Sequence, residues 1–134
     1  MTTAFGMLHP VIQHHIANTL GWNDLRALQQ DAVAPVLDGT DALLIAPTAG
    51  GKTEAAIFPL LTGMAERGRM DVSVLYNCPL KALLNNLESR IANYAGWMGR
   101  SAAVWHGDVD SVGRRQIKLS RPDICSPHPN PWNR

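Results

Sequence analysis

The chain has 134 residues, enough for one compact domain and too few for two domains of ordinary size. Its net charge of +1 excludes a uniformly basic or acidic chain, so any basic surface for nucleic acid must be local. No apolar run approaches the roughly 20 residues of a membrane span, and the start MTTAFGMLHP lacks a signal-peptide pattern. Cys78 and Cys125 have neither metal-site nor disulfide-framework spacing. We therefore expect a cytoplasmic protein with no membrane partner.

The first 40 residues predict two helices. A helix over 10–20 carries one apolar stripe and stops at Gly21, and a second begins after Asn23 or Asp24 and ends at Gly39. Pro35 near its end predicts a kink. The apolar positions of the two helices are Val11, Ile12, Ile16 and Leu20, then Leu25, Leu28, Ala32, Val33, Val36 and Leu37.

Residues 41–123 alternate between short apolar runs and helical patterns. The runs, which predict buried strands, cover 42–46, 72–76 and 102–105. The helices between and after them are expected over about 52–67, 79–94 and 111–119. This alternation is typical of an α/β fold in which helices flank a parallel sheet.

The C-terminal segment breaks this pattern. RPDICSPHPNPWNR carries four of the nine prolines and shows neither helical nor strand periodicity. We therefore predict residues 124–134 to be irregular.

A glycine-rich loop, APTAGGKT over residues 46–53, follows the first predicted strand and opens a helix. Gly50 and Gly51 allow the backbone to turn its N–H groups toward a polyphosphate at the positive end of the helix. Lys52 can reach the β- and γ-phosphates of ATP, and the Thr53 hydroxyl can ligate Mg²⁺. The first position of the usual pattern holds Ala46 in place of glycine. The alternative is a chance GGKT turn that only caps a helix.

The form A-x-T-x-x-G-K-T resembles motif I of superfamily 2 helicases. Upstream, LQQDAVAPVLDGTD resembles the Q motif of DEAD/DEAH-box proteins, in which a glutamine reads the adenine edge. The alternative for this glutamine is an ordinary solvated helix residue. The resemblance implies a P-loop NTPase (RecA-like) fold that binds ATP and Mg²⁺ through Gln29, Ala46, Thr48, Ala49, Gly50, Gly51, Lys52 and Thr53.

Two further segments resemble helicase motifs that touch nucleic acid. PLKAL, over 79–83, is similar to motif Ia, and WHGD, over 105–108 with a basic helix after it, is similar to bacterial large helicase-related proteins. The alternatives are a helix that begins at proline and a solvated basic helix face. The resemblance implies contacts to DNA or RNA from Pro79, Lys81, His106, Arg114 and Arg115.

The resemblance covers the first part of one RecA-like domain. The acidic pair of motif II, which holds Mg²⁺ and orients water, does not occur in these residues, nor does a second RecA-like domain with its arginine finger. That finger contributes a factor of roughly 10³ to 10⁵ in related NTPases. We therefore expect no complete catalytic set, an incomplete sheet and a truncated, inactive helicase fragment.

The tail suggests a cause for the truncation. In large helicase-related proteins a segment like PDI continues as LLTTPESLE. The codons possible for the tail after Ile124 can encode that sequence in another reading frame, as if one base had been lost. We hypothesise that residues 125–134 are out of frame; a genuine short protein is the rival explanation.

Two other function classes stay open on the sequence. A small P-loop kinase or other phosphotransferase would use the same loop, with the helicase-like matches as coincidences. A non-catalytic nucleotide-binding module that regulates a full-length helicase is the other.

Overall fold

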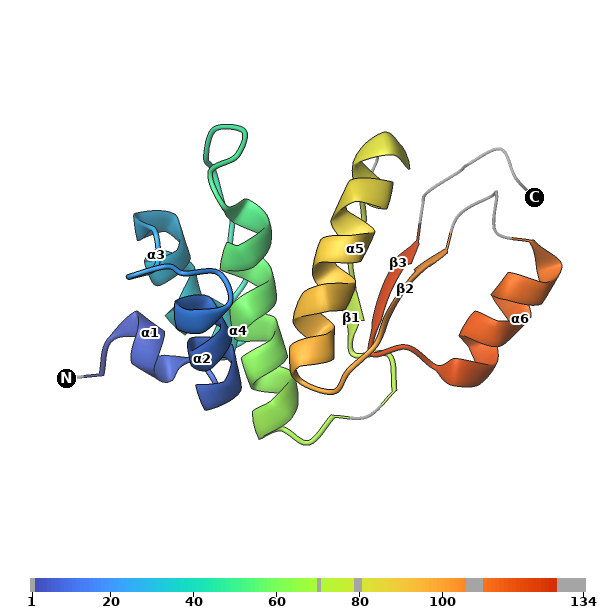
Figure 1. Cartoon of the computed structure of the whole chain (residues 1–134), viewed down its shortest axis with the longest axis horizontal. Helices are drawn as coiled ribbons and strands as arrows, with labels where there is room; N and C mark the ends of the chain where they lie inside the picture. The colour runs from blue at the N-terminus through green and yellow to red at the C-terminus, as the bar shows by residue number, and fades with distance from the viewer. Residues whose placement is uncertain (1, 70, 79–80, 106–109, 128–134) are drawn as a thin grey trace. The chain divides into compact units, whose positions relative to one another are not determined.

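The computed structural model describes residues 2–69, 71–78, 81–105 and 110–127 (Figure 1). The chain divides into two compact units, Met1–Gly68 and Arg69–Arg134, and each has its own packing. In the described part of the chain, no helix has the length and apolar character that crossing a membrane requires.

The first unit is helical. It contains α1 (Ala4–Met7), α2 (Pro10–Asn18), α3 (Ala27–Leu37) and α4 (Lys52–Glu66), so three predicted helices are confirmed. The second of them starts later than expected, because Arg26 is its N-cap and Asp24 accepts instead from the N–H of Leu25. The expected cap at residue 23 or 24 is therefore wrong.

Packing of α3 against α4 forms the core of this unit. Apolar side chains from α2, α3 and α4 are buried there, and the N–H of His9 donates to the buried hydroxyl of Thr62 over 3.0 Å. The largest of these apolar side chains are Ile12, Ile16, Val33, Ile57, Phe58 and Leu61.

The segment 42–46, predicted as a buried strand, is not a strand in the structure. Leu43 and Ile45 are 84% and 79% exposed. A strand needs a hydrogen-bonding neighbour, and the described part of the first unit contains none, so this apolar run stays an extended connection. The residues themselves suit a strand, and what they lack is a strand to pair with.

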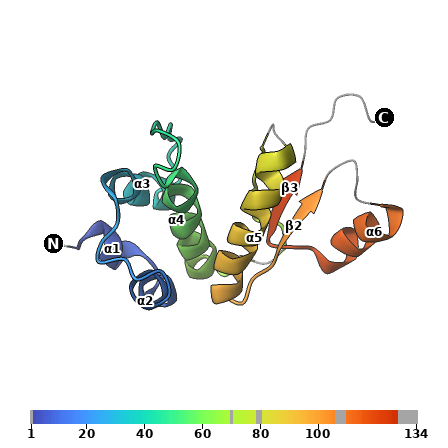
Figure 2. The same cartoon turned by 45° about the horizontal axis from the view of Figure 1, so that its top comes forward.

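The second unit is a three-stranded parallel sheet with two helices. Its elements are β1 (Val74–Leu75), α5 (Lys81–Trp97), β2 (Ala102–Trp105), α6 (Ser111–Ser120) and β3 (Ile124–Pro127). The strand order is β1-β3-β2, so the chain crosses from β1 to β2 and returns to the middle. The connection through α5 runs from β1 to β2, and the connection through α6 runs back from β2 to β3. Because such crossovers are right-handed, the two helices lie on opposite faces of the sheet, as Figures 1 and 2 show.

The middle strand, β3, was expected to be irregular. The prediction of an irregular segment over 124–134 is wrong for 124–127, where Ile124 pairs with Val74 on one side and Ala102 on the other. The neighbouring strands β1 and β2 provide hydrogen-bonding partners for the β3 backbone on both sides. This pairing overrides the weak strand composition of residues 124–127. Ile124 is fully buried and Ser126 nearly so.

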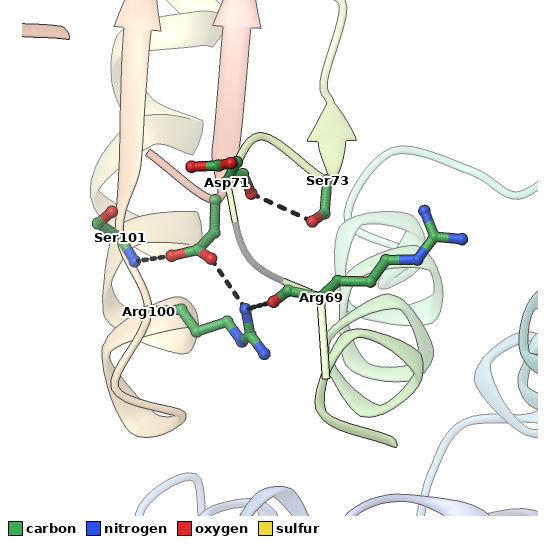
Figure 3. Close-up of polar contacts among 6 residues, drawn as sticks. Arg69, Asp71, Ser73, Arg100 and Ser101 are labelled. Carbon is green, nitrogen blue, oxygen red and sulfur yellow. Dashed lines mark hydrogen bonds and ion pairs between the residues drawn. The ribbon is translucent and has the colours of Figure 1, made fainter. Parts of the chain in front are cut away.

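Asp123 joins the three strands where they begin. Its carboxylate accepts from the Arg100 guanidinium over 2.8 Å and from the N–H of Ser101 over 3.1 Å, just before β2. Its backbone carbonyl accepts from the N–H of Ser73, just before β1, over 2.9 Å. Figure 3 shows Arg100 donating also to the carbonyl of Arg69, over 2.5 Å. One residue thus fixes the relative positions of all three strands.

Candidate nucleotide-binding site

The phosphate loop occupies residues 46–51 and leads into α4, which begins at Lys52. Gly51 is the N-cap, with a left-handed φ of 79° that favours glycine. A Cβ added there would lie 2.5 Å from Nε2 of Gln29, and one added to Gly50 would lie 2.8 Å from the carbonyl oxygen of Pro47. Both glycines are therefore needed for close approach. The predicted loop-to-helix step is confirmed, although the strand before it is not.

The loop is closed on itself. Nζ of Lys52 donates to the carbonyl of Ala46 over 2.7 Å and to that of Pro47 over 3.1 Å. The N–H of Gly50 donates to the same Pro47 carbonyl over 3.0 Å. An ammonium and a backbone N–H are the donors that a phosphate would use. The Pro47 carbonyl thus accepts from both of these donors.

Gln29 lies against this loop, although it is 22 positions away from Gly51 in the chain. Its Nε2 donates to the Gly51 carbonyl over 3.4 Å, and its Oε1 accepts from the N–H of Arg26 over 2.9 Å. Gln29 is only 1% exposed. The alternative of a solvated helix residue is therefore wrong, and Gln29 packs against the loop.

Two residues of this site were missed from the sequence. Arg26 donates from Nη1 to the carbonyl of Ala49 over 2.6 Å, and Glu54 is buried in the first turn of α4. The partial positive charge at a helix N-terminus favours a carboxylate there, so an acidic residue right after GKT was the available signal for Glu54. Arg26 gives no such signal, because its partner lies 23 positions away.

The site fits the phosphates of a nucleotide better than a free metal ion. Its donors are the Lys52 ammonium and the backbone N–H of Gly50, which bind anions, and Thr53 lies half-buried in the first turn of α4. Among the described residues, no group of three or more His, Cys, Asp or Glu side chains could hold a metal. A Mg²⁺ ion here would be held by the Thr53 hydroxyl together with phosphate oxygens.

The residues expected to contact nucleic acid are only partly described. Pro79 and His106 lie outside the described residues, and Lys81 begins α5 without a described side chain. Arg114 is half-buried and Arg115 exposed on α6, whose N-cap Asp110 accepts from the N–H of Gly113 over 2.7 Å. The residues around Lys81 and α6 belong to the second unit, and those of the phosphate loop to the first.

Cys125 is a half-buried thiol in β3. Burial in β3 raises the pKa of its thiol, because desolvation disfavours the thiolate. Cys125 is therefore a protonated packing residue near neutral pH.

Known proteins similar to this chain are helicases. The family model of the DEAD/DEAH box helicases matches residues 26–133. The chain is 31% identical over 134 residues to the ATP-dependent helicase Lhr-Core of Methanothermobacter thermautotrophicus, an alignment that covers 88% of this chain and 15% of that protein. It is 29% identical over 105 residues to the ATP-dependent RNA helicase DBP9 of Coccidioides immitis, covering 72% and 17%.

The fold also matches solved helicase structures. A structure of the Mycobacterium smegmatis helicase Lhr bound to ssDNA and AMP-PNP superposes with a TM-score of 0.81 at 24% identity, covering 94% of this chain and 17% of that one. The predicted α/β, RecA-like fold is thus confirmed, in incomplete form. The kinase alternative is not favoured, and the chain spans less than a fifth of either relative named above. The chain belongs to the DEAD/DEAH box helicase family.

Proposed function

We propose that this chain is the ATP-binding portion of an ATP-dependent nucleic-acid helicase, with the nucleotide on the phosphate loop. The observation that carries the proposal is the meeting of Gln29 with Gly51 at the start of α4. In this family such a glutamine reads adenine, and the contact of Gln29 with Gly51 supports the same role for Gln29. A chance GGKT turn would not require a buried glutamine against it.

Each part of the loop has a proposed role. The N–H groups at Gly50 and Gly51 and the ammonium of Lys52 would bind the phosphates, and the Thr53 hydroxyl would ligate Mg²⁺. ATP supplies the phosphoryl group whose hydrolysis drives a helicase. We assign to this chain the binding of ATP, and to longer relatives the hydrolysis and unwinding that need motif II and a second RecA-like domain.

A titration of the purified chain with Mg²⁺ and AMP-PNP tests the proposal. We expect Lys52→Ala to weaken binding by at least tenfold, because the lysine charge acts directly on phosphate. Lys118→Ala is the matched control, since Lys118 is an exposed lysine on α6. Equal binding by all three proteins would remove the proposal.

We propose that the second unit contacts the nucleic acid, which is DNA or RNA. Arg115 is exposed on α6, which is the basic helix after the WHGD segment. The solved relative was bound to ssDNA, and cationic side chains contact phosphates without sequence preference. Arg115→Ala should weaken binding of a single-stranded oligonucleotide at low salt a few-fold, measured by fluorescence anisotropy; unchanged binding would contradict this role.

A further inference from the structure

The Ala49–Gly50 peptide of the phosphate loop is held by a hydrogen bond at each end. A peptide bond is planar, so the carbonyl of Ala49 and the N–H of Gly50 turn together. Here the carbonyl accepts from Arg26 over 2.6 Å, and the N–H donates to Pro47 over 3.0 Å. Both ends of one rigid plane are therefore held by the protein itself.

A phosphate can receive the N–H of Gly50 only if this plane turns. The turn would break the bond to Pro47 and, because the plane is rigid, would also carry the Ala49 carbonyl away from Arg26. Ala49 has φ 63°, a left-handed conformation that is strained for a residue with a Cβ. The closed loop thus contains strain that the bonds of the closed state offset.

We infer that Arg26 is a latch that holds the phosphate loop in this closed conformation, and that nucleotide binding releases it. This inference rests on the proposed function and adds to it a residue that acts through the loop backbone. Arg26 is a positioning residue: its guanidinium favours one orientation of the Ala49–Gly50 peptide. A contact present only in the closed state shifts the equilibrium against binding.

Arg26→Ala is a clean test because the side chain is exposed and the helix cap does not need it. The cap bond at the start of α3 joins the backbone N–H of residue 26 to Gln29, so alanine retains it. The matched control is Arg67→Ala: Arg67 is also exposed and donates from Nη2 to a carbonyl, that of Leu37, over 2.7 Å in the same unit.

Two readouts distinguish the latch from a mere structural role. Amide hydrogen exchange at Gly50, measured by NMR without nucleotide, should become about three- to fivefold faster in Arg26→Ala, as expected for loss of one exposed charge-assisted hydrogen bond. Affinity for Mg²⁺ and AMP-PNP should rise by a similar factor. Arg26→Lys should restore part of the protection, and Arg67→Ala should change neither quantity.

The outcomes separate this inference from the proposed function. Unchanged exchange at Gly50, or weaker nucleotide binding by Arg26→Ala, would overturn the latch. If neither the wild-type chain nor the variant binds AMP-PNP, the proposed function fails, and the exchange measurement alone decides whether Arg26 holds the loop.

Discussion

Each of the two units contains one segment whose strand formation is the opposite of what its composition predicts. In the first unit, residues 42–46 have the composition of a buried strand and remain exposed, with Ile45 79% accessible. In the second unit, Ile124–Pro127 has a poor strand composition and becomes the middle strand of a sheet. Strand formation here follows the availability of hydrogen-bonding neighbours more than the residues themselves.

The difference extends to how each unit holds its functional segment. Asp123 ties three strands together in the second unit through side-chain and backbone oxygens. In the first unit, the phosphate loop is held by a few contacts to α3, and it uses its own carbonyls as acceptors. A loop held in this way can exchange its internal bonds for bonds to a ligand.

The largest effect on the free energy of unfolding is expected at Ile124, and Ile45 is the matching isoleucine of the first unit. Ile124→Thr should lower the free energy of unfolding by about 2–3 kcal/mol, because it removes buried methyl surface and buries a hydroxyl. Ile45→Thr should change it by less than about 0.5 kcal/mol, since the side chain is already in water. Urea denaturation measures both. A large loss in Ile45→Thr would mean that 42–46 is packed after all.

A smaller effect is expected at the start of the sheet. Asparagine at position 123 retains the shape but turns one carboxylate oxygen into a donor, so either Arg100 or the Ser101 N–H loses its acceptor. Because the side chains of Arg100 and Asp123 are only 14% and 19% exposed, Asp123→Asn should cost about 2 kcal/mol in thermal or urea unfolding.

Asp71→Asn is the control for this substitution. Asp71 pairs with Arg121 at 3.5 Å, and the side chains of Asp71 and Arg121 are 61% and 69% exposed, so water screens the pair. Its loss should stay within about 0.5 kcal/mol. Equal losses at 71 and 123 would contradict the structural role of Asp123.

The smallest effect concerns the glycine at the start of α4. Gly51→Ala and Gly39→Ala both place a Cβ at positive φ, but nothing lies within 4 Å of a Cβ at Gly39. At Gly51 it would lie 2.5 Å from the buried amide of Gln29. The unfolding free energy should therefore fall by about 1 kcal/mol more for Gly51→Ala than for Gly39→Ala. Equal losses would mean that Gln29 does not press on the loop.

The sequence was sufficient for the elements whose stability is local. Periodicity predicted helices close to α2, α3, α4, α5 and α6, and the alternation of elements predicted a parallel sheet. Motif spacing predicted the phosphate loop, and the structure adds that Gln29 packs against it. The assigned ligand roles of these residues and the proposed domain boundaries stay predictions, as does the frame-shifted tail.

What the sequence could not give depends on contacts between distant residues. Whether 42–46 or 124–127 becomes a strand is decided by neighbours elsewhere in the chain. The Arg26 contact requires a loop 23 positions away to return to the start of α3. No pattern around Arg26 distinguishes it from any exposed arginine near a helix start.

NMR can locate the nucleotide and so tests most directly whether the phosphate loop binds ATP. Mg²⁺ and AMP-PNP should be titrated into the ¹⁵N-labelled chain while backbone amide shifts are followed. We expect the largest changes at Gly50, Gly51, Lys52 and Thr53, with smaller ones at Gln29. No shift in these amides, or changes confined to residues 71–127, would contradict this expectation.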